Sequence, residues 1–203
     1  MKTLQLTQEA LEDARLPKAF WPLGSDTYFG NRLALKQSEH YIRKHAEALA
    51  SGTGLLLIGP PSSLKTFLLT YILRCLLAKG HSVRYTTLDE LVDLYFQREG
   101  VSIGSELCTD RFVAVDNLSE VINKAAPNAL KALFRRRRDN GLCTLFATDL
   151  EDAEFTRQYG PVAESVEESS LKIHCSSKSF QLAERRDRRL SQLSLHEEGV
   201  HAN

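Results

Sequence analysis

A short loop in the first third of the chain combines the residue types that bind phosphate. It follows a run of aliphatic residues, Leu55 to Ile58, and it ends in Lys65 and Thr66. This order approaches the pattern Gly-x-x-x-x-Gly-Lys-Ser/Thr, in which backbone N–H groups surround the phosphates, the lysine contacts the β and γ phosphates, and the hydroxyl binds Mg²⁺. The predicted nucleotide-binding residues are therefore Gly59, Pro60, Pro61, Ser62, Ser63, Leu64, Lys65 and Thr66.

Leu64 departs from the pattern, because it occupies the place of the second glycine. Glycine adopts unusual backbone angles at little cost and lets the chain approach a phosphate, whereas leucine adds a Cβ and a bulky side chain. We expect this substitution to weaken nucleotide affinity. The competing interpretation is an ordinary turn between a strand and a helix, with a lysine at the helix start by chance.

A second candidate lies at the end of the apolar run Phe112 to Val115. An enzyme with a phosphate-binding loop needs a carboxylate at the tip of a buried strand beside the loop, where it holds Mg²⁺ directly or through water. Asp116 has this place, so Thr66 and Asp116 are the predicted magnesium ligands. The competing interpretation is an aspartate that caps a turn after a core strand.

The elements around these residues alternate between strand and helix patterns. Predicted strands cover residues 55–58, 82–87, 111–117, 142–147 and 172–175, and predicted helices cover 8–15, 31–50, 67–78, 88–96 and 129–138, with a connector at 100–106. Such alternation is typical of a parallel α/β sheet that binds its ligands at the carboxyl ends of the strands. We therefore predict an α/β fold of the P-loop NTPase class, with a parallel sheet flanked by helices.

Composition limits the class of protein. The 203 residues include 26 Lys plus Arg and 26 Asp plus Glu, so the formal net charge of zero gives no global attraction to nucleic acid or membrane. The 4 cysteines form no Cys-x-x-Cys pair, which favours reduced thiols in a cytoplasmic protein without a membrane partner. We expect an N-terminal arm over residues 1–30, one domain over 31–190 and a disordered tail over 191–203.

Taken together, the motifs resemble the DnaC/IstB-like branch of AAA+ ATPases, which comprises bacterial helicase loaders and transposition accessory ATPases. The resemblance covers residues 16–186. The segments that carry it are Leu16 to Trp21, Gly59 to Thr66, Lys79 to Tyr85, Asp116 with Asn117, Tyr159 to Pro161, and Ser179 to Leu182. The aspartate-asparagine pair and the arm around Trp21 and Pro22 also resemble DnaA-related regulators of replication initiation.

This resemblance implies an AAA+ core that binds ATP or ADP with Mg²⁺. It also implies action in DNA replication or transposition, with a replicative helicase, a transposase or an initiator protein as partner, and with DNA. In AAA+ proteins a polar residue at the end of the strand matching 142–147 contacts the γ phosphate or the attacking water. Thr148 is the candidate for this role and Asp149 a weaker one, so the implied catalytic set is Asp116, Asn117 and Thr148.

Two departures from the family pattern concern catalysis. Most AAA+ members carry a glutamate that polarises the attacking water where this chain has Asn117, and an amide is no substitute for that base. The loaders carry a serine-arginine pair where this chain has Ser165 and Val166, so the arginine that acts on a neighbouring subunit is missing. Both departures predict weak or absent ATP hydrolysis.

Two arginine clusters complete the candidate sites. One consists of Arg135, Arg136, Arg137 and Arg138, near the end of a predicted helix, and the other lies within residues 185–189. Four consecutive residues span just over one helical turn, so they cannot all face a core. The functional interpretation is contact of Arg135 to Arg138 with the phosphate backbone of DNA, and the competing one is a solvated helix end.

The sequence leaves three functions open. The first is a helicase loader or accessory factor that binds nucleotide and hydrolyses it slowly or not at all. The second is a pseudo-ATPase adaptor that binds a protein partner without nucleotide. The third is an active ATPase of unusual loop chemistry. Measured nucleotide affinity separates the first two.

Overall fold

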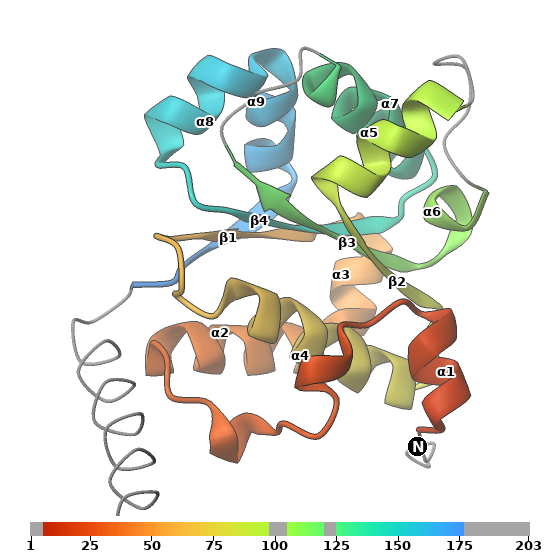
Figure 1. Cartoon of the computed structure of the whole chain (residues 1–203), viewed down its shortest axis with the longest axis vertical. Helices are drawn as coiled ribbons and strands as arrows, with labels where there is room; N and C mark the ends of the chain where they lie inside the picture. The colour runs from red at the N-terminus through yellow and green to blue at the C-terminus, as the bar shows by residue number, and fades with distance from the viewer. Residues whose placement is uncertain (1–5, 98–104, 120–124, 177–203) are drawn as a thin grey trace, which may run out of the picture.

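The computed structural model describes residues 6–97, 105–119 and 125–176, and Figure 1 shows a sheet with helices on both of its faces. The strands are β1 (Gly54–Ile58), β2 (Val83–Thr87), β3 (Phe112–Leu118), β4 (Cys143–Thr148) and β5 (Ser170–His174). They pair in the order β2-β3-β4-β1-β5, and every pairing is parallel. The prediction of an α/β fold with a parallel sheet flanked by helices is confirmed.

The helices divide between the two faces. They are α1 (Gln8–Asp13), α2 (Arg32–Arg43), α3 (His45–Ser51), α4 (Lys65–Ala78), α5 (Leu88–Gln97), α6 (Ser105–Thr109), α7 (Ala126–Asp139), α8 (Asp152–Tyr159) and α9 (Pro161–Glu168). In Figure 1, α2 and α4 cover one face together with the N-terminal arm, while α5, α7, α8 and α9 cover the other. None of the helices in the described ranges is long and apolar enough to cross a bilayer.

The central strands explain why their sequences read as continuous apolar runs. All residues of β1 are buried, and alternate side chains point to opposite faces of the sheet. Leu55 and Leu57 join the apolar cluster under α2 and α4, whereas Leu56 and Ile58 join the cluster under α5, α7 and α9. A strand that is covered on both faces has no polar side to display.

Three segments differ from the predicted elements. The helix predicted at 31–50 is two helices separated at Lys44, whose backbone leaves the helical region. Residues 105–109, at the end of the predicted connector, form α6, and α8 and α9 were not predicted. Gly160 has a φ of 56° between α8 and α9, and Pro161 begins α9, where its fixed φ suits a first helical position.

The N-terminal arm packs against the rest of the chain. Its buried residues Leu11, Leu16 and Tyr28 belong to the same apolar cluster as α4. The Trp21 Nε1 donates to the Leu16 carbonyl at 2.9 Å, which fixes the tryptophan ring within the arm. The guanidinium of Arg74 on α4 donates to carbonyl groups of the arm, those of Phe20, Trp21 and Leu23. The tail predicted at 191–203 lies outside the described residues.

Candidate nucleotide site

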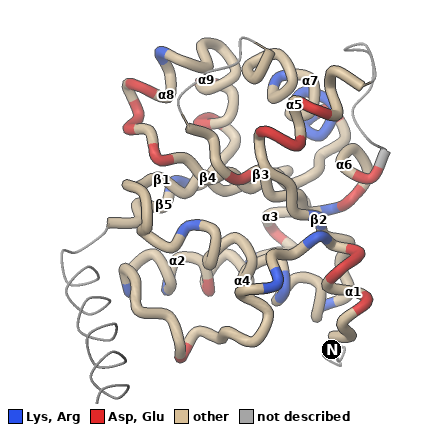
Figure 2. The backbone as a smooth tube through the Cα atoms, viewed as in Figure 1, with Lys and Arg blue, Asp and Glu red and all other residues tan. Residues whose placement is uncertain are grey.

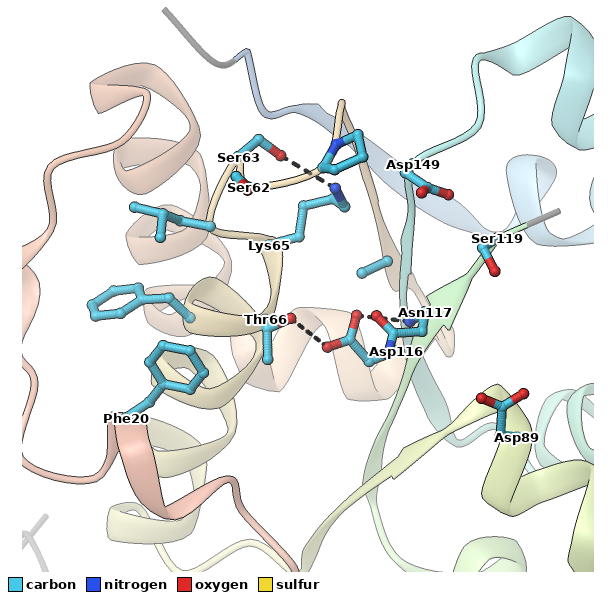
Figure 3. A pocket seen from close by; sticks show the side chains of 14 residues that line it. Phe20, Ser62, Ser63, Lys65, Thr66, Asp89, Asp116, Asn117, Ser119 and Asp149 are labelled. Carbon is cyan, nitrogen blue, oxygen red and sulfur yellow. Dashed lines mark hydrogen bonds between the residues drawn. The ribbon is translucent and has the colours of Figure 1, made fainter. Parts of the chain in front are cut away.

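The loop between β1 and α4 opens onto a pocket of about 460 Å³. Figure 3 shows this pocket at the ends of β1, β3 and β4, which is the usual place for ligands of a parallel sheet. The pocket brings together the predicted residues Pro61 to Thr66, Asp116 and Asn117. Gly59 and Pro60 lie at the start of the loop and are not among the lining residues.

The backbone of the loop contains two residues in a conformation that glycine adopts most readily. Ser62 and Leu64 have φ values of 64° and 66°, in the left-handed region. For leucine this conformation costs about 1–2 kcal/mol. The Leu64 side chain, half-buried, packs against the apolar cluster that contains Phe67, and it also forms part of the pocket wall. Leu64 therefore adopts the left-handed backbone conformation that glycine would take without strain, and it is strained there.

Replacing Leu64 with glycine is expected to tighten nucleotide binding, because the strain and the side chain at the pocket wall are both removed. Stability should change little, since relief of about 1–2 kcal/mol of strain offsets a similar loss of apolar burial. Isothermal titration with ATP and Mg²⁺ measures the effect. Leu64→Ala is the matched control, because alanine keeps the Cβ and most of the strain. Equal affinity in all three proteins would contradict this prediction.

The Lys65 side chain is held within the loop by hydrogen bonds to other loop residues. Its Nζ donates to the carbonyl oxygens of Gly59 at 2.6 Å and Pro60 at 2.9 Å, and to the Ser63 Oγ at 3.2 Å. Burial lowers the pKa of Lys65, while the negative charges of Asp149 and Asp116 act in the opposite direction. Phosphate oxygens would be stronger acceptors than these neutral carbonyl groups, because both partners of the hydrogen bond would then be charged.

The opposite side of the pocket contains the predicted magnesium ligands. Thr66 Oγ1 donates to Asp116 Oδ2 at 2.6 Å, as Figure 3 shows, and the Tyr85 hydroxyl donates to the same oxygen at 2.7 Å. The Asn117 N–H donates to Asp116 Oδ1 at 2.8 Å. Asp116 is only 2% exposed. Burial, and then the charge of Asp116, raise the pKa of Tyr85, so its hydroxyl remains a donor.

These two residues fit a magnesium ion. By donating its proton to Asp116, the Thr66 hydroxyl keeps its oxygen lone pairs for a cation. Hydroxyl and carboxylate oxygens are the hard ligands that Mg²⁺ accepts, and it commonly binds through one or two carboxylates together with substrate phosphates and water. Thr66 and Asp116 would therefore hold the metal beside the loop.

Asn117 is presented by an irregularity in β3. The pairing of β3 with β4 shifts register between Val115 and Leu118, and Asn117 has a φ of 61°. Asparagine tolerates this left-handed backbone better than most residues, and a bulge of this kind redirects a side chain. Asn117 is exposed and lines the pocket, where a neutral amide is the group presented next to Asp116.

The end of β4 differs from the arrangement implied by the family resemblance. Thr148 is fully buried; its hydroxyl donates to the Leu118 carbonyl and accepts from the Leu150 N–H at 3.1 Å. The Thr148 hydroxyl is thus hydrogen-bonded to the backbone, and Thr148 is not among the residues that line the pocket. Asp149, the weaker candidate, is exposed and does line it. Figure 3 shows its carboxylate on the Lys65 side of the pocket.

Several pocket residues were not predicted as site residues. The most prominent are Phe20 from the arm, Asp89 from α5 and Ser119 after β3. Phe20 packs edge-on against Phe67, with ring centroids 6.0 Å apart. No local motif identifies these residues, because each reaches the pocket only through the packing of its own element.

The predicted DNA contact is wrong for Arg137. This side chain is fully buried: its Nε donates to Thr144 Oγ1 at 3.0 Å, and its Nη atoms donate to the carbonyl oxygens of Leu107, Asp110 and Cys143 at 2.7 to 2.9 Å. Burial lowers the pKa of Arg137 to about 10, so the group remains charged at neutral pH. Arg137 is thus a structural cross-link between α7, α6 and the starts of β3 and β4.

The other three arginines of this cluster are exposed. Arg135 lies 3.8 Å from Asp139, and the Arg138 guanidinium lies 6.0 Å from the centre of the Phe134 ring. Figure 2 shows the basic positions of α7 with acidic positions of α5 beside them. The second cluster, at 185–189, lies outside the described residues. DNA contact by Arg135, Arg136 and Arg138 stays a prediction.

Comparison with known proteins adds a fold assignment to this geometry. The sequence matches no family model and no curated protein. Among solved structures, the DnaC helicase loader superposes with a TM-score of 0.66 at 18% identity, covering 78% of this chain and 99% of that one. DnaI gives a TM-score of 0.60 at 16% identity, and the match covers 83% of this chain and 94% of the DnaI chain. The initiator DnaA bound to AMPPCP and single-stranded DNA gives a TM-score of 0.62 at 14% identity, and the match covers 80% of this chain and 51% of the DnaA chain.

The chain has a DnaC-like AAA+ fold. The predicted fold class, the parallel-sheet architecture of P-loop NTPases, is thereby confirmed. At these identities the likeness establishes the architecture alone, so each functional role must be argued from the residues of the pocket. The chain spans about half the length of the DnaA structure and nearly all of the DnaC and DnaI structures.

Proposed function

We propose that this protein is a nucleotide-binding AAA+ factor of DNA replication, of the helicase-loader or accessory type, with slow or absent ATP hydrolysis. The observation that supports this most is the meeting of Lys65, Thr66 and Asp116 in one pocket at the ends of β1 and β3. The fold neighbours are a helicase loader and a replication initiator, which favours replication over transposition. A replicative helicase or an initiator would be the protein partner.

Each side of the pocket has a separate task in this proposal. The loop N–H groups and Lys65 would bind the phosphates of ATP or ADP, as in other phosphate-binding loops. Thr66 and Asp116 would hold Mg²⁺, which when bound neutralises charge on the β and γ phosphates. Asn117 can orient a water molecule but cannot take its proton, because an amide is not a base. Binding is therefore retained while turnover is slow.

The adaptor without nucleotide is the second candidate, and one observation favours it. Lys65 has three hydrogen-bond acceptors within its own loop, so the loop is internally satisfied as it stands. A nucleotide has to displace these contacts to bind the ammonium group. In this alternative the fold supplies only a surface for a protein partner.

Titration calorimetry with ATP and with ADP, each with Mg²⁺ and with EDTA, tests the proposal. We expect binding with Mg²⁺ and negligible phosphate release in a parallel assay with single-stranded DNA. Absence of binding at millimolar nucleotide would exclude the proposed function and leave the adaptor. Rapid phosphate release that Asp116→Ala removes would instead identify an active ATPase with another base, for which Asp89 and Asp149, the other carboxylates that line the pocket, are candidates.

Charge removal on α7 tests DNA binding. The double change Arg135→Gln with Arg138→Gln should weaken binding of unrelated single strands equally and flatten the plot of log affinity against log salt by about two units, because each phosphate contact contributes roughly one. Fluorescence anisotropy between low and moderate salt measures both quantities. The matched control is Arg32→Gln with Arg43→Gln, exposed positions on α2 across the sheet. The same loss in both double variants would show that net charge matters and the α7 surface does not.

A further inference from the structure

The carboxylate of Asp116 is fixed at both of its oxygen atoms. Oδ2 accepts hydrogen bonds from the Thr66 and Tyr85 hydroxyl groups, and Oδ1 accepts one from the Asn117 N–H. An aspartate carboxylate otherwise rotates over a broad range about its last torsion. Thr66 and Asn117 are parts of the loop and strand motifs, whereas Tyr85 comes from a different strand, β2, and belongs to neither motif.

Tyr85 is itself held in place from two directions. The pairing of β2 with β3 sets Tyr85 opposite Ala114, two positions before the pair formed by Thr87 and Asp116. On the other side of β2, which is an edge strand, the Tyr85 N–H donates to the Ala14 carbonyl of the arm at 2.9 Å. The residue is only 8% exposed. Its hydroxyl therefore reaches Asp116 from a backbone position with little freedom.

We propose that Tyr85 is a positioning residue for the metal side of the pocket, and that its hydroxyl holds Asp116 so that Asp116 and Thr66 present their oxygens together to Mg²⁺. This inference rests on the proposed nucleotide-binding function. Partners of metal ligands in other proteins orient the ligand, and their removal costs about 10–100-fold in metal affinity. Tyr85 would act in the same way, without touching the ion.

The test is Tyr85→Phe, which removes only the hydroxyl and keeps the packed ring. The affinity for a fluorescent ADP analogue is measured across a range of Mg²⁺ concentrations and in EDTA. We expect the half-saturating Mg²⁺ concentration to rise about 10–100-fold, with affinity in EDTA unchanged. Direct titration with Mn²⁺, followed by electron paramagnetic resonance, should show the same loss for the metal probe itself.

Tyr41→Phe is the matched control, because the Tyr41 hydroxyl is also hydrogen-bonded within the protein but away from the pocket: it donates to the Thr53 carbonyl at 2.9 Å and has Cys143 as a further partner. Both variants should lose similar thermal stability, and only Tyr85→Phe should change the Mg²⁺ requirement. An unchanged requirement in Tyr85→Phe, with normal binding by the wild-type protein, would overturn this inference alone. Wild-type protein that binds neither nucleotide nor Mn²⁺ would overturn the proposed function together with it.

Discussion

Lys65→Ala is expected to reduce nucleotide affinity by at least about 100-fold. Lys65 is the only cation among the described residues that line the pocket, where it stands with the carboxylates of Asp89, Asp116 and Asp149. Two charge-assisted hydrogen bonds to phosphate contribute about 1.5–3 kcal/mol each, and every 1.4 kcal/mol is a factor of ten. Without the lysine the remaining charge of the pocket repels a triphosphate.

Titration with ATP and Mg²⁺ measures this loss, and Lys79→Ala is the control. Lys79 caps the opposite end of α4, so its removal deletes the same charge from the same helix without touching the loop. The thermal midpoint of both variants should be recorded, because Lys65 also bonds the carbonyl groups of its own loop. Unchanged affinity in a folded Lys65→Ala protein would remove the loop from the proposed site.

Arg137→Met is expected to destabilise the protein by about 3–5 kcal/mol, since it leaves a set of buried acceptors without a donor. The bonds to Leu107, Asp110 and Cys143 join α7 to α6 and to the start of β4, so the loss affects three separate segments of the chain. Denaturation in urea measures the change. The urea concentration at the midpoint of unfolding should fall sharply, because about 3–5 kcal/mol is a large part of the stability of an ordinary domain.

The next residue provides the control. Arg138→Met removes an identical exposed group from the same helix and should change the free energy of unfolding by no more than about 0.5 kcal/mol. Equal effects of the two substitutions would contradict the burial of Arg137. Nucleotide affinity is a second readout. Arg137 belongs to α7, which covers the face of the sheet opposite α4 and its loop, so the substitution should change affinity only through folding.

The sequence predicts the central strands well because burial leaves a direct trace in composition. β1, β3 and β4 are covered on both faces, so their residues are almost uniformly apolar and their ends stand out. The short helices α8 and α9 leave a weaker trace, since each has eight residues and no side-chain hydrogen bond caps its start. Tertiary packing, more than local propensity, defines them.

The site residues also fall into two groups, those that local sequence patterns identify and those that only tertiary packing identifies. Lys65, Thr66 and Asp116 belong to local patterns that bring chemistry and spacing together, and they meet in one pocket. Tyr85 reaches Asp116, and Phe20 reaches the pocket wall, through contacts between distant segments, which spacing does not encode. Among four adjacent arginines, only the packing of α7 distinguishes the one that lies in the core, so the sequence could not exclude Arg137 from the surface.

The contact between the arm and β2 couples two parts of the molecule mechanically. The Ala14 carbonyl takes the outward N–H of Tyr85, so the arm closes the sheet edge at the residue whose side chain holds Asp116. A binding partner that lifted α1 away would expose that edge to strand addition and, in the same event, remove one of the two backbone contacts of Tyr85, leaving only its pairing with β3. If the proposed function holds, metal binding and protection of the sheet edge would then weaken in the same event.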